Sequence, residues 1–342
     1  MRIRKSRQYR SRKVRYLQYV TSIFIQFERA CVCRVLWCNP NHRPPHHQKE
    51  TTMDYGYIRT RDLGLTRSQI RQKMKNGELF RVRRGWYCTH EPTIFDQLLV
   101  LQAMHPNLVF TGKTALALHL RQLPEGEIEA VIPKHQRIPK IAGVKIKRSR
   151  SVKSEVVRIF RCVSMIEAAL ETPEDERPRD LVEKLNEHYA KRKGKRQWIY
   201  DIKNVRRRHL ARAVKKDFAY VLPGAYSKQE LRVGQGLVQR GYEVEMSFKV
   251  CGYMFDIKIR KTDVLVELDS FMFHEGEGRK RTFVTDRWKQ NAATMAGHRV
   301  LRFTTDDTFH YLDLVLDEIE RAIHFQETAV TEVWKGLDPA VA

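Results

Sequence analysis

The chain has 342 residues, enough for two or three domains, and 42% of them are hydrophobic while 30% are charged. This balance is typical of a folded globular protein rather than a disordered one. The formal net charge of +24 favours an anionic partner, and nucleic acid is the first candidate. No segment approaches the roughly 20 apolar residues of a transmembrane helix, and six cysteines are too few for a disulfide scaffold. We therefore expect a cytoplasmic protein with no membrane partner.

Residues 1–52 differ in composition from the rest of the chain. Twelve lysines and arginines stand against two glutamates, so this segment contributes +10 of the net charge. It lacks the clean apolar region and the small-residue cleavage site of a signal peptide. Two interpretations stay open: a disordered basic arm that follows phosphates, or a translated leader ahead of a biological start at Met53.

Residues 57–87 carry the pattern of a winged helix-turn-helix. A short helix is expected over residues 60–63. Thr66 is a candidate N-cap with Gln69 three residues later, and this capping box predicts a helix that runs to Asn76 and stops at Gly77. In the functional interpretation this helix enters a major groove of DNA. The alternative is an ordinary helical hairpin with a solvated basic face.

A strand over residues 78–84 and a turn into residues 86–87 would form the wing, whose arginines would contact the DNA backbone. The nucleic-acid-binding candidates here are Arg67, Arg71, Gln72, Arg83 and Arg84. Helices are expected over residues 94–123, 164–171 and 178–192, with short strands between residues 128 and 161.

Residues 191–216 are densely basic and are expected to include a helix lined by arginines and lysines. The net charge favours a DNA-facing element, with Arg206 and Arg207 as candidates, over a solvated linker helix.

Two predicted strands, residues 253–259 and 264–269, carry the acidic residues of a candidate nuclease site. Because strand side chains alternate, Asp256 and Lys258 should share one face, opposite Phe255, Ile257 and Ile259. Glu267 and Asp269 should likewise lie together, opposite the apolar residues at 264, 266 and 268. A hairpin of these strands would bring Asp256 close to Glu267. Acids within otherwise buried strands are informative, because an unpaired buried charge is costly.

Carboxylates gathered in this way are suitable ligands for Mg²⁺ or Mn²⁺, which would activate a water molecule for attack on a phosphodiester. The predicted metal ligands are Asp256, Glu267 and Asp269. His274, in the next loop, is a candidate base or ligand, although a lone loop histidine is more often simply exposed. Glu230 is explained equally well as residue N3 of a helix that begins at Ser227, and we favour this capping role.

The segment from residue 227 to residue 324 carries a set of motifs in a fixed order. They are Asp256, Glu267-Leu-Asp269, His274, Asp286-Arg287, and a glycine-led strand from Gly297 to Thr304. Together they resemble an uncharacterised domain family grouped with the Vsr (very-short-patch-repair) endonucleases of the PD-(D/E)XK superfamily. The resemblance implies a mixed sheet flanked by helices and adds Arg287 to the DNA-contacting candidates.

This sequence departs from the superfamily at Asp269, which stands where the motif usually has lysine. The position is acidic in this branch too. Lys258 is a candidate for a relocated lysine among the catalytic residues.

Residues 55–170 resemble the N-terminal winged-helix domain of AbiEi-type antitoxins. The run from Gly77 to Tyr87 and the helix after Phe110-Thr111 carry this likeness. The two resemblances imply a DNA-binding head joined to a nuclease-like tail, in phage defence or toxin–antitoxin biology. A cognate toxin protein is therefore a candidate partner besides DNA.

We predict an α/β (α+β) protein with an N-terminal winged helix and a C-terminal PD-(D/E)XK-like sheet. The expected divisions are 1–52, 53–125, 126–220, 221–326 and a tail over 327–342. The predicted function is metal-dependent DNA phosphodiester hydrolysis in defence or repair. One alternative is an antitoxin-type transcriptional regulator with an inactive nuclease fold, and another is an RNA-binding protein that uses the basic segments alone.

Overall fold

The computed structural model describes residues 57–150, 152–206, 208–269 and 278–325. These all belong to the second of two units into which the chain divides, Met1–Tyr55 and Gly56–Ala342. The predictions for residues 1–52, Arg207, His274 and residues 327–342 thus lie outside the described residues. Helices are combined with sheets that contain both parallel and antiparallel pairs, which confirms the α/β class. None of the helices in the described ranges has the length and apolarity to cross a membrane.

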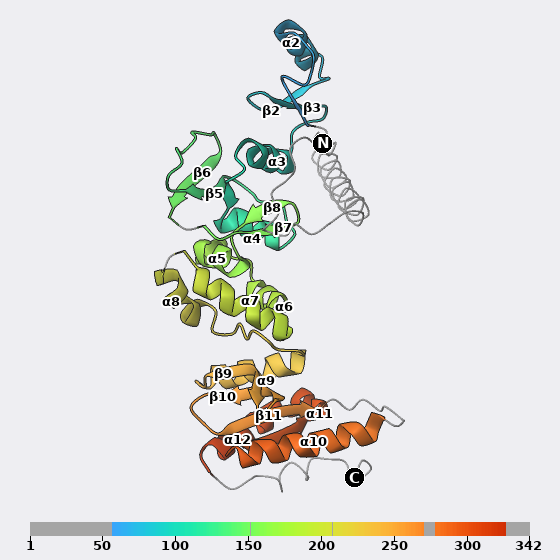
Figure 1. The fold of residues 1–342 in the computed structure, drawn as a ribbon, viewed down its shortest axis with the longest axis vertical. Coiled ribbons are helices and arrows are strands. Elements are labelled where there is room, and N and C mark those ends of the chain that lie inside the picture. Colours follow the sequence, from blue (N-terminus) through green and yellow to red (C-terminus); the bar gives the residue numbers. More distant parts are fainter. Residues whose placement is uncertain (1–56, 151, 207, 270–277, 326–342) are drawn as a thin grey trace, which may run out of the picture. The chain divides into compact units, whose positions relative to one another are not determined.

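The first elements form a small sheet with one helix (Figure 1). They are β1 (Tyr57–Arg59), α2 (Arg67–Lys75), β2 (Phe80–Arg83) and β3 (Trp86–Cys88), with strand order β1-β3-β2. The predicted capping box of α2 is confirmed, since Thr66 N donates to Gln69 Oε1 at 2.8 Å and Gln69 N donates to Thr66 Oγ1 at 3.3 Å. The short helix expected over residues 60–63 is wrong. This segment is a turn, because the Thr60 amide donates to Gly85 O at 3.0 Å and so continues the sheet.

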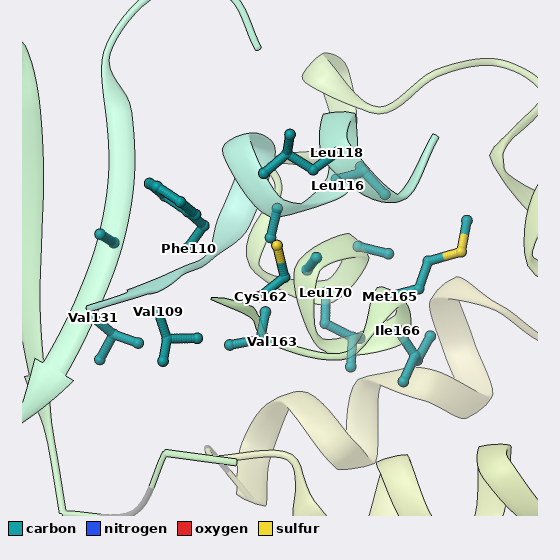
Figure 2. Packing of buried hydrophobic residues seen from close by; sticks show 14 of the residues in the cluster. Val109, Phe110, Leu116, Leu118, Val131, Cys162, Val163, Met165, Ile166 and Leu170 are labelled. Carbon is teal, nitrogen blue, oxygen red and sulfur yellow. The ribbon is translucent and has the colours of Figure 1, made fainter. Parts of the chain in front are cut away.

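The central part of the chain is built around a five-stranded sheet of order β6-β5-β4-β8-β7. Its elements are α3 (Ile94–Met104), β4 (Val109–Phe110), α4 (Gly112–His119), β5 (Ile128–Pro133), β6 (Val144–Ser149), β7 (Glu155–Val157), β8 (Phe160–Cys162) and α5 (Met165–Glu171). Figure 2 shows Phe110 and Val163 among the buried side chains that pack here. The expected helix over 94–123 is interrupted by β4, which pairs with both β5 and β8. The expected domain boundary at residue 125 therefore falls inside one sheet.

A layer of helices completes the central core. It consists of a short 3-10 turn (Glu174–Glu176), α6 (Leu181–His188), α7 (Lys191–Asn204) and α8 (Arg208–Asp217). A single hydrophobic cluster extends from Leu98 in α3 to Val221 after α8. The basic segment 191–216 thus forms two helices, and the first of them ends at Val205, whose φ of −55° and ψ of 124° are not helical.

The C-terminal part has a four-stranded sheet of order β12-β11-β10-β9. Its elements are α9 (Lys228–Gln239), β9 (Val244–Val250), β10 (Tyr253–Ile259), β11 (Val264–Asp269), α10 (Gly278–Met295), β12 (Arg299–Thr304), α11 (Thr305–His310) and α12 (Leu312–Ile323). Val264 and Val266 pack with α9 and α12, whereas Leu265 packs on the other face with Ala293 of α10. Strand β12 runs parallel to β11, and the remaining neighbours are antiparallel. The sheet therefore has helices on both faces.

Candidate active site

The candidate site lies where β10 and β11 separate. Their backbone pairing is recorded at Ile257 with Val266 and at Lys258 with Leu265. Beyond these pairs, a side chain of β10 binds the backbone of β11. Asp256 Oδ2 accepts a hydrogen bond from Leu268 N at 2.8 Å. Asp256 is thereby fixed between the strands, half-buried, with its carboxylate directed to β11. Burial raises its pKa, and the charge of Asp269 adds to this, although the cations of Lys289 and Arg302 oppose it.

Near Asp256, the side chains of strand β10 depart from regular alternation between the two faces of the sheet. Ile257 and Ile259 pack in the cluster with α9 and α12, but Phe255 belongs to the cluster with α10. The prediction that Phe255 shares a face with the two isoleucines is therefore wrong. The pairing skips Ser247, which has a φ of +50° and lies opposite Asp256 between the Phe248 and Met246 positions. This distortion of β9 beside Asp256 breaks the regular alternation.

Glu267 is the most perturbed acid of the site. Its side chain is buried, with only 6% of the residue exposed, and Oε2 accepts a hydrogen bond from Lys289 Nζ at 2.6 Å. Its other oxygen, Oε1, is buried and has no hydrogen-bond partner among the residues that the structure describes. Burial first, and then the charge of Asp256, raise the pKa of Glu267 to about 7 against the pull of Lys289. The charge of Asp256 therefore acts on Glu267, whereas a direct contact between the two carboxylates stays a prediction.

Asp269 is held differently from the other two acids. Arg302 of β12 binds it with two hydrogen bonds, Nε to Oδ2 at 2.8 Å and Nη2 to Oδ1 at 2.7 Å. Arg302 also lies 3.7 Å from Asp286 of α10. Parallel pairing of β11 with β12 places Arg302 beside Glu267, one residue pair before Asp269. Both oxygens of Asp269 are therefore engaged by the guanidinium.

Lys258 does not reach these carboxylates. Its Nζ donates to Thr262 O at 2.6 Å and lies 3.3 Å from His298 Nδ1. Burial lowers the pKa of this lysine. The structure instead brings Lys289 of α10 to Glu267, where Nζ also lies 4.7 Å from the ring centre of Phe255. Lys289, rather than the predicted Lys258, is therefore the lysine that contacts a carboxylate of the candidate site.

Glu230 belongs to the same neighbourhood through α9. Its amide donates to Ser227 Oγ at 3.1 Å, which confirms the N-cap, but its carboxylate accepts from Tyr226 N at 2.8 Å rather than from the cap residue itself. Glu230 is buried, and its pKa is raised by burial and further by the charge of Asp256. Ser227 is therefore the N-cap, but the carboxylate of Glu230 does not complete the capping box, and its pKa is influenced by Asp256.

The donor set fits a divalent cation only in part. Among the described residues there is no group of three or more acids, histidines or cysteines arranged to hold a metal ion. Asp269 is occupied by Arg302, so the predicted three-carboxylate set is not assembled. Asp256 and Glu267 remain as candidate ligands, and Glu267 Oε1 has no hydrogen-bond partner among the described residues. Such a pair suits Mg²⁺, which is usually held by one or two carboxylates together with substrate phosphates.

The predicted nucleic-acid contacts divide into exposed and inward-facing residues. Arg67, Arg71 and Gln72 on α2 are exposed, as are Arg84 and Arg287. Arg83 instead donates to Ala142 O at 3.0 Å and to Gln97 Oε1 at 3.2 Å, and burial lowers its pKa. Arg206 is buried and forms ion pairs with Glu167 and Glu171. Arg83 and Arg206 therefore face the protein rather than a phosphate backbone.

Sequence reasoning did not single out Lys289 or Arg302 as site residues. For Lys289, the sequence offered one indication. Asp286, Lys289 and Ala293 are spaced by three and four residues, so all three lie on one face of α10. Their meeting with the acids depends on how α10 packs on the sheet, which the pattern of a single helix does not specify.

Comparisons with known proteins add little to this picture. No protein-family profile matches the chain, and no curated protein sequence matches it. Among solved structures, the catalytic domain of the homing endonuclease I-Bth0305I is similar at 19% identity and a TM-score of 0.24, covering 28% of this chain and 92% of that domain. A TM-score of this size does not assign a fold. The resemblances to the AbiEi-type and Vsr families stay predictions.

Proposed function

We propose that this protein is a metal-dependent endonuclease that hydrolyses DNA phosphodiesters at the Asp256–Glu267 pair. The observation that carries this proposal is the buried oxygen Glu267 Oε1, which has no hydrogen-bond partner among the described residues, on a carboxylate bound by Lys289 and influenced by the charge of Asp256. Burying a carboxylate oxygen without a partner is costly, so such an atom favours a site completed by a bound cation. The net charge of +24 supports a polyanionic substrate.

Asp256 and Glu267 would hold the ion, Mg²⁺ or Mn²⁺. When bound, the metal would supply Lewis acidity and a water molecule of lowered pKa for attack on phosphorus. The protein's own residues prepare this site. Leu268 N fixes the Asp256 carboxylate through its 2.8 Å hydrogen bond, and Arg302 holds Asp269 at the edge of the site.

Lys289 would have two roles in the proposed reaction. Its hydrogen bond orients Glu267, and its ammonium group places a positive charge next to the carboxylates. A cation there would attract a phosphate oxygen and stabilise the charge that develops on it during hydrolysis. Glu267, with a pKa raised to about 7, would exchange a proton near neutral pH when no metal is present.

The N-terminal sheet and α2 would serve to bind DNA. Arg67 and Arg71 are exposed on α2. In this proposal they contact DNA from a winged-helix module, and the protein acts in defence or repair, with a cognate toxin as a further candidate partner. Lys75, on the same helix, adds to its positive charge near the C-terminal end.

A second candidate function is supported by Asp269. Because Arg302 neutralises this acid, the described residues assemble two carboxylates rather than three. A DNA-binding regulator with an inactive nuclease fold would tolerate such an arrangement. We rank it second, because Glu267 Oε1, which has no hydrogen-bond partner among the described residues, belongs to a carboxylate that also experiences the charge of a second acid, Asp256.

A cleavage assay separates the two functions. The full-length protein would be incubated with plasmid, linear and mismatched DNA, with Mg²⁺ or Mn²⁺ and with a chelator. The proposal predicts metal-dependent cutting that is lost on Glu267→Gln and kept on Glu183→Gln, a control at an exposed carboxylate of α6. Binding of DNA without cutting on every substrate would favour the regulator.

A further inference from the structure

The cations that the basic segment 191–216 exposes to solvent differ from those predicted from its composition. Arg206 is turned inward, whereas helix α7 carries exposed basic residues along its length. An α-helix advances 100° per residue, so residues spaced by three, four and seven share one side. The exposed residues on this side of α7, which we call the α7 surface, are Arg192, Lys193, Arg196, Ile199, Tyr200 and Lys203.

The opposite side of α7 is fully occupied by the protein. Gly194 is buried so closely against the preceding chain that a Cβ there would overlap the carbonyl group of Tyr189. Asp201 is buried, accepting from Tyr189 Oη at 2.9 Å and from Gln197 Nε2 at 2.8 Å. Lys195 Nζ reaches Glu245 Oε1 in β9 at 2.8 Å. The orientation of α7 is thus fixed by its inner face, and this leaves the α7 surface directed to solvent.

The cations of the α7 surface lack acidic partners within the part of the chain that the structure describes. Among the described residues, no carboxylate forms an ion pair with Arg192, Arg196 or Lys203, although Lys195 on the inner side has one. Two uncharged side chains lie among them, Ile199 and Tyr200, which are 58% and 53% exposed. A row of cations along one helix face, without ion-pair partners among the described residues, is the electrostatic footprint of a surface for nucleic acid.

We propose that the α7 surface binds the sugar-phosphate backbone of double-stranded DNA. This inference rests on the proposed function, since it supplies a way to hold that substrate. From Arg192 to Lys203 the helix rises about 16 Å, a length over which duplex DNA carries about nine phosphate charges. Cations on a helix face that contact only phosphates position the duplex without reading its sequence, so binding through this surface is independent of sequence.

The test compares two charge-matched triple variants of the full-length protein. The first is Arg192→Gln, Arg196→Gln, Lys203→Gln, in which glutamine keeps the helix propensity high. The control is Lys134→Gln, Arg137→Gln, Lys140→Gln, which removes three exposed cations of the β5–β6 connection. Binding to a random-sequence duplex is measured in chelator across a salt series, so that cleavage does not enter the result, and circular dichroism checks that both variants are folded.

The α7 variant is expected to bind on the order of 100-fold more weakly at about 0.15 M salt, and its log K against log[salt] slope should fall by about 2.7. The control should change the slope by less than about one, because its cations are not placed to contact the same phosphates. Equal losses in the two variants would overturn the proposal, since they would reflect net charge alone. The proposal would also be overturned if the folded α7 variant bound the duplex as the wild type does but no longer bound anionic lipid vesicles.

The proposed nuclease and this surface can fail separately. If Glu267→Gln leaves cleavage intact but the α7 variant loses duplex binding, the surface stands and the assigned metal site falls. If cleavage depends on Glu267 but the α7 variant binds and cuts as the wild type does, the surface falls and the nuclease stands.

Discussion

Replacing Glu267 with glutamine should stabilise the metal-free protein at pH 8 and leave its stability nearly unchanged at pH 5. Burial and the neighbouring Asp256 raise the pKa of Glu267 from 4.5 to about 7. At about 1.36 kcal/mol for each pKa unit, ionising this buried group costs the folded state roughly 3 kcal/mol. The folded protein therefore holds a proton that the unfolded chain has released between these two pKa values.

The sign of the effect follows from this difference in bound protons. The contribution of Glu267 to stability is fully present below pH 4.5 and is lost as the pH rises through about 7. Glutamine does not ionise and still offers an oxygen to Lys289, so the variant escapes the loss. Because Lys289 forfeits an ionic partner, we expect a net gain of about 1–3 kcal/mol at pH 8.

The assay is urea denaturation at pH 5, 6, 7 and 8 in the presence of a chelator. The difference in unfolding free energy between Glu267→Gln and the wild type should grow with pH. Glu183→Gln, at an exposed position of α6, should follow the wild type at every pH. A Glu267→Gln variant that is less stable than the wild type at pH 8 would refute the reasoning, because Glu267 would then be stabilising as a metal-free anion.

Three further outcomes are expected. Arg206→Ala should lower the free energy of unfolding, measured by urea denaturation, by about 3–5 kcal/mol, because it leaves two buried glutamate side chains unpaired. Arg212→Ala, at an exposed position, should change it by less than about 0.5 kcal/mol. Lys289→Met should move the acidic limb of the cleavage pH profile upward, because Glu267 loses the cation that lowers its pKa; an unmoved limb would remove Lys289 from the site. Gly194→Ala should destabilise by about 1–3 kcal/mol, because its Cβ meets backbone, and a thermal midpoint equal to wild type would contradict the packing described.

Local features of the fold were accessible from the sequence. The capping box of Thr66 and Gln69 is written in adjacent residues, and the structure contains both of its hydrogen bonds. The facing of Glu267 and Asp269 also followed from strand alternation, because β11 is regular over its whole length. For these two features, the residues of a single helix or strand determine the structure, so the sequence pattern was sufficient to predict it.

Features that depend on several elements were not accessible. Phe255 changes faces because the β9 strand beside it is distorted at Ser247, and nothing in the β10 pattern indicates this. The basic composition around Arg206 predicted a DNA-facing helix, but this arginine forms ion pairs with two glutamates of α5. Lys289 reaches Glu267 only through the packing of α10 on the sheet. In each case the deciding partner is distant in sequence.

Asp256 and Glu267 are proposed to hold a divalent cation, and this binding is measured by a calorimetric titration of the full-length protein with Mn²⁺ at pH 8. Wild type and Glu183→Gln should bind with the same affinity, and Glu267→Gln should lose that binding. The loss should appear without DNA, so the result does not depend on finding the right substrate. Equal Mn²⁺ affinity in all three proteins, or none in the wild type, would contradict the account.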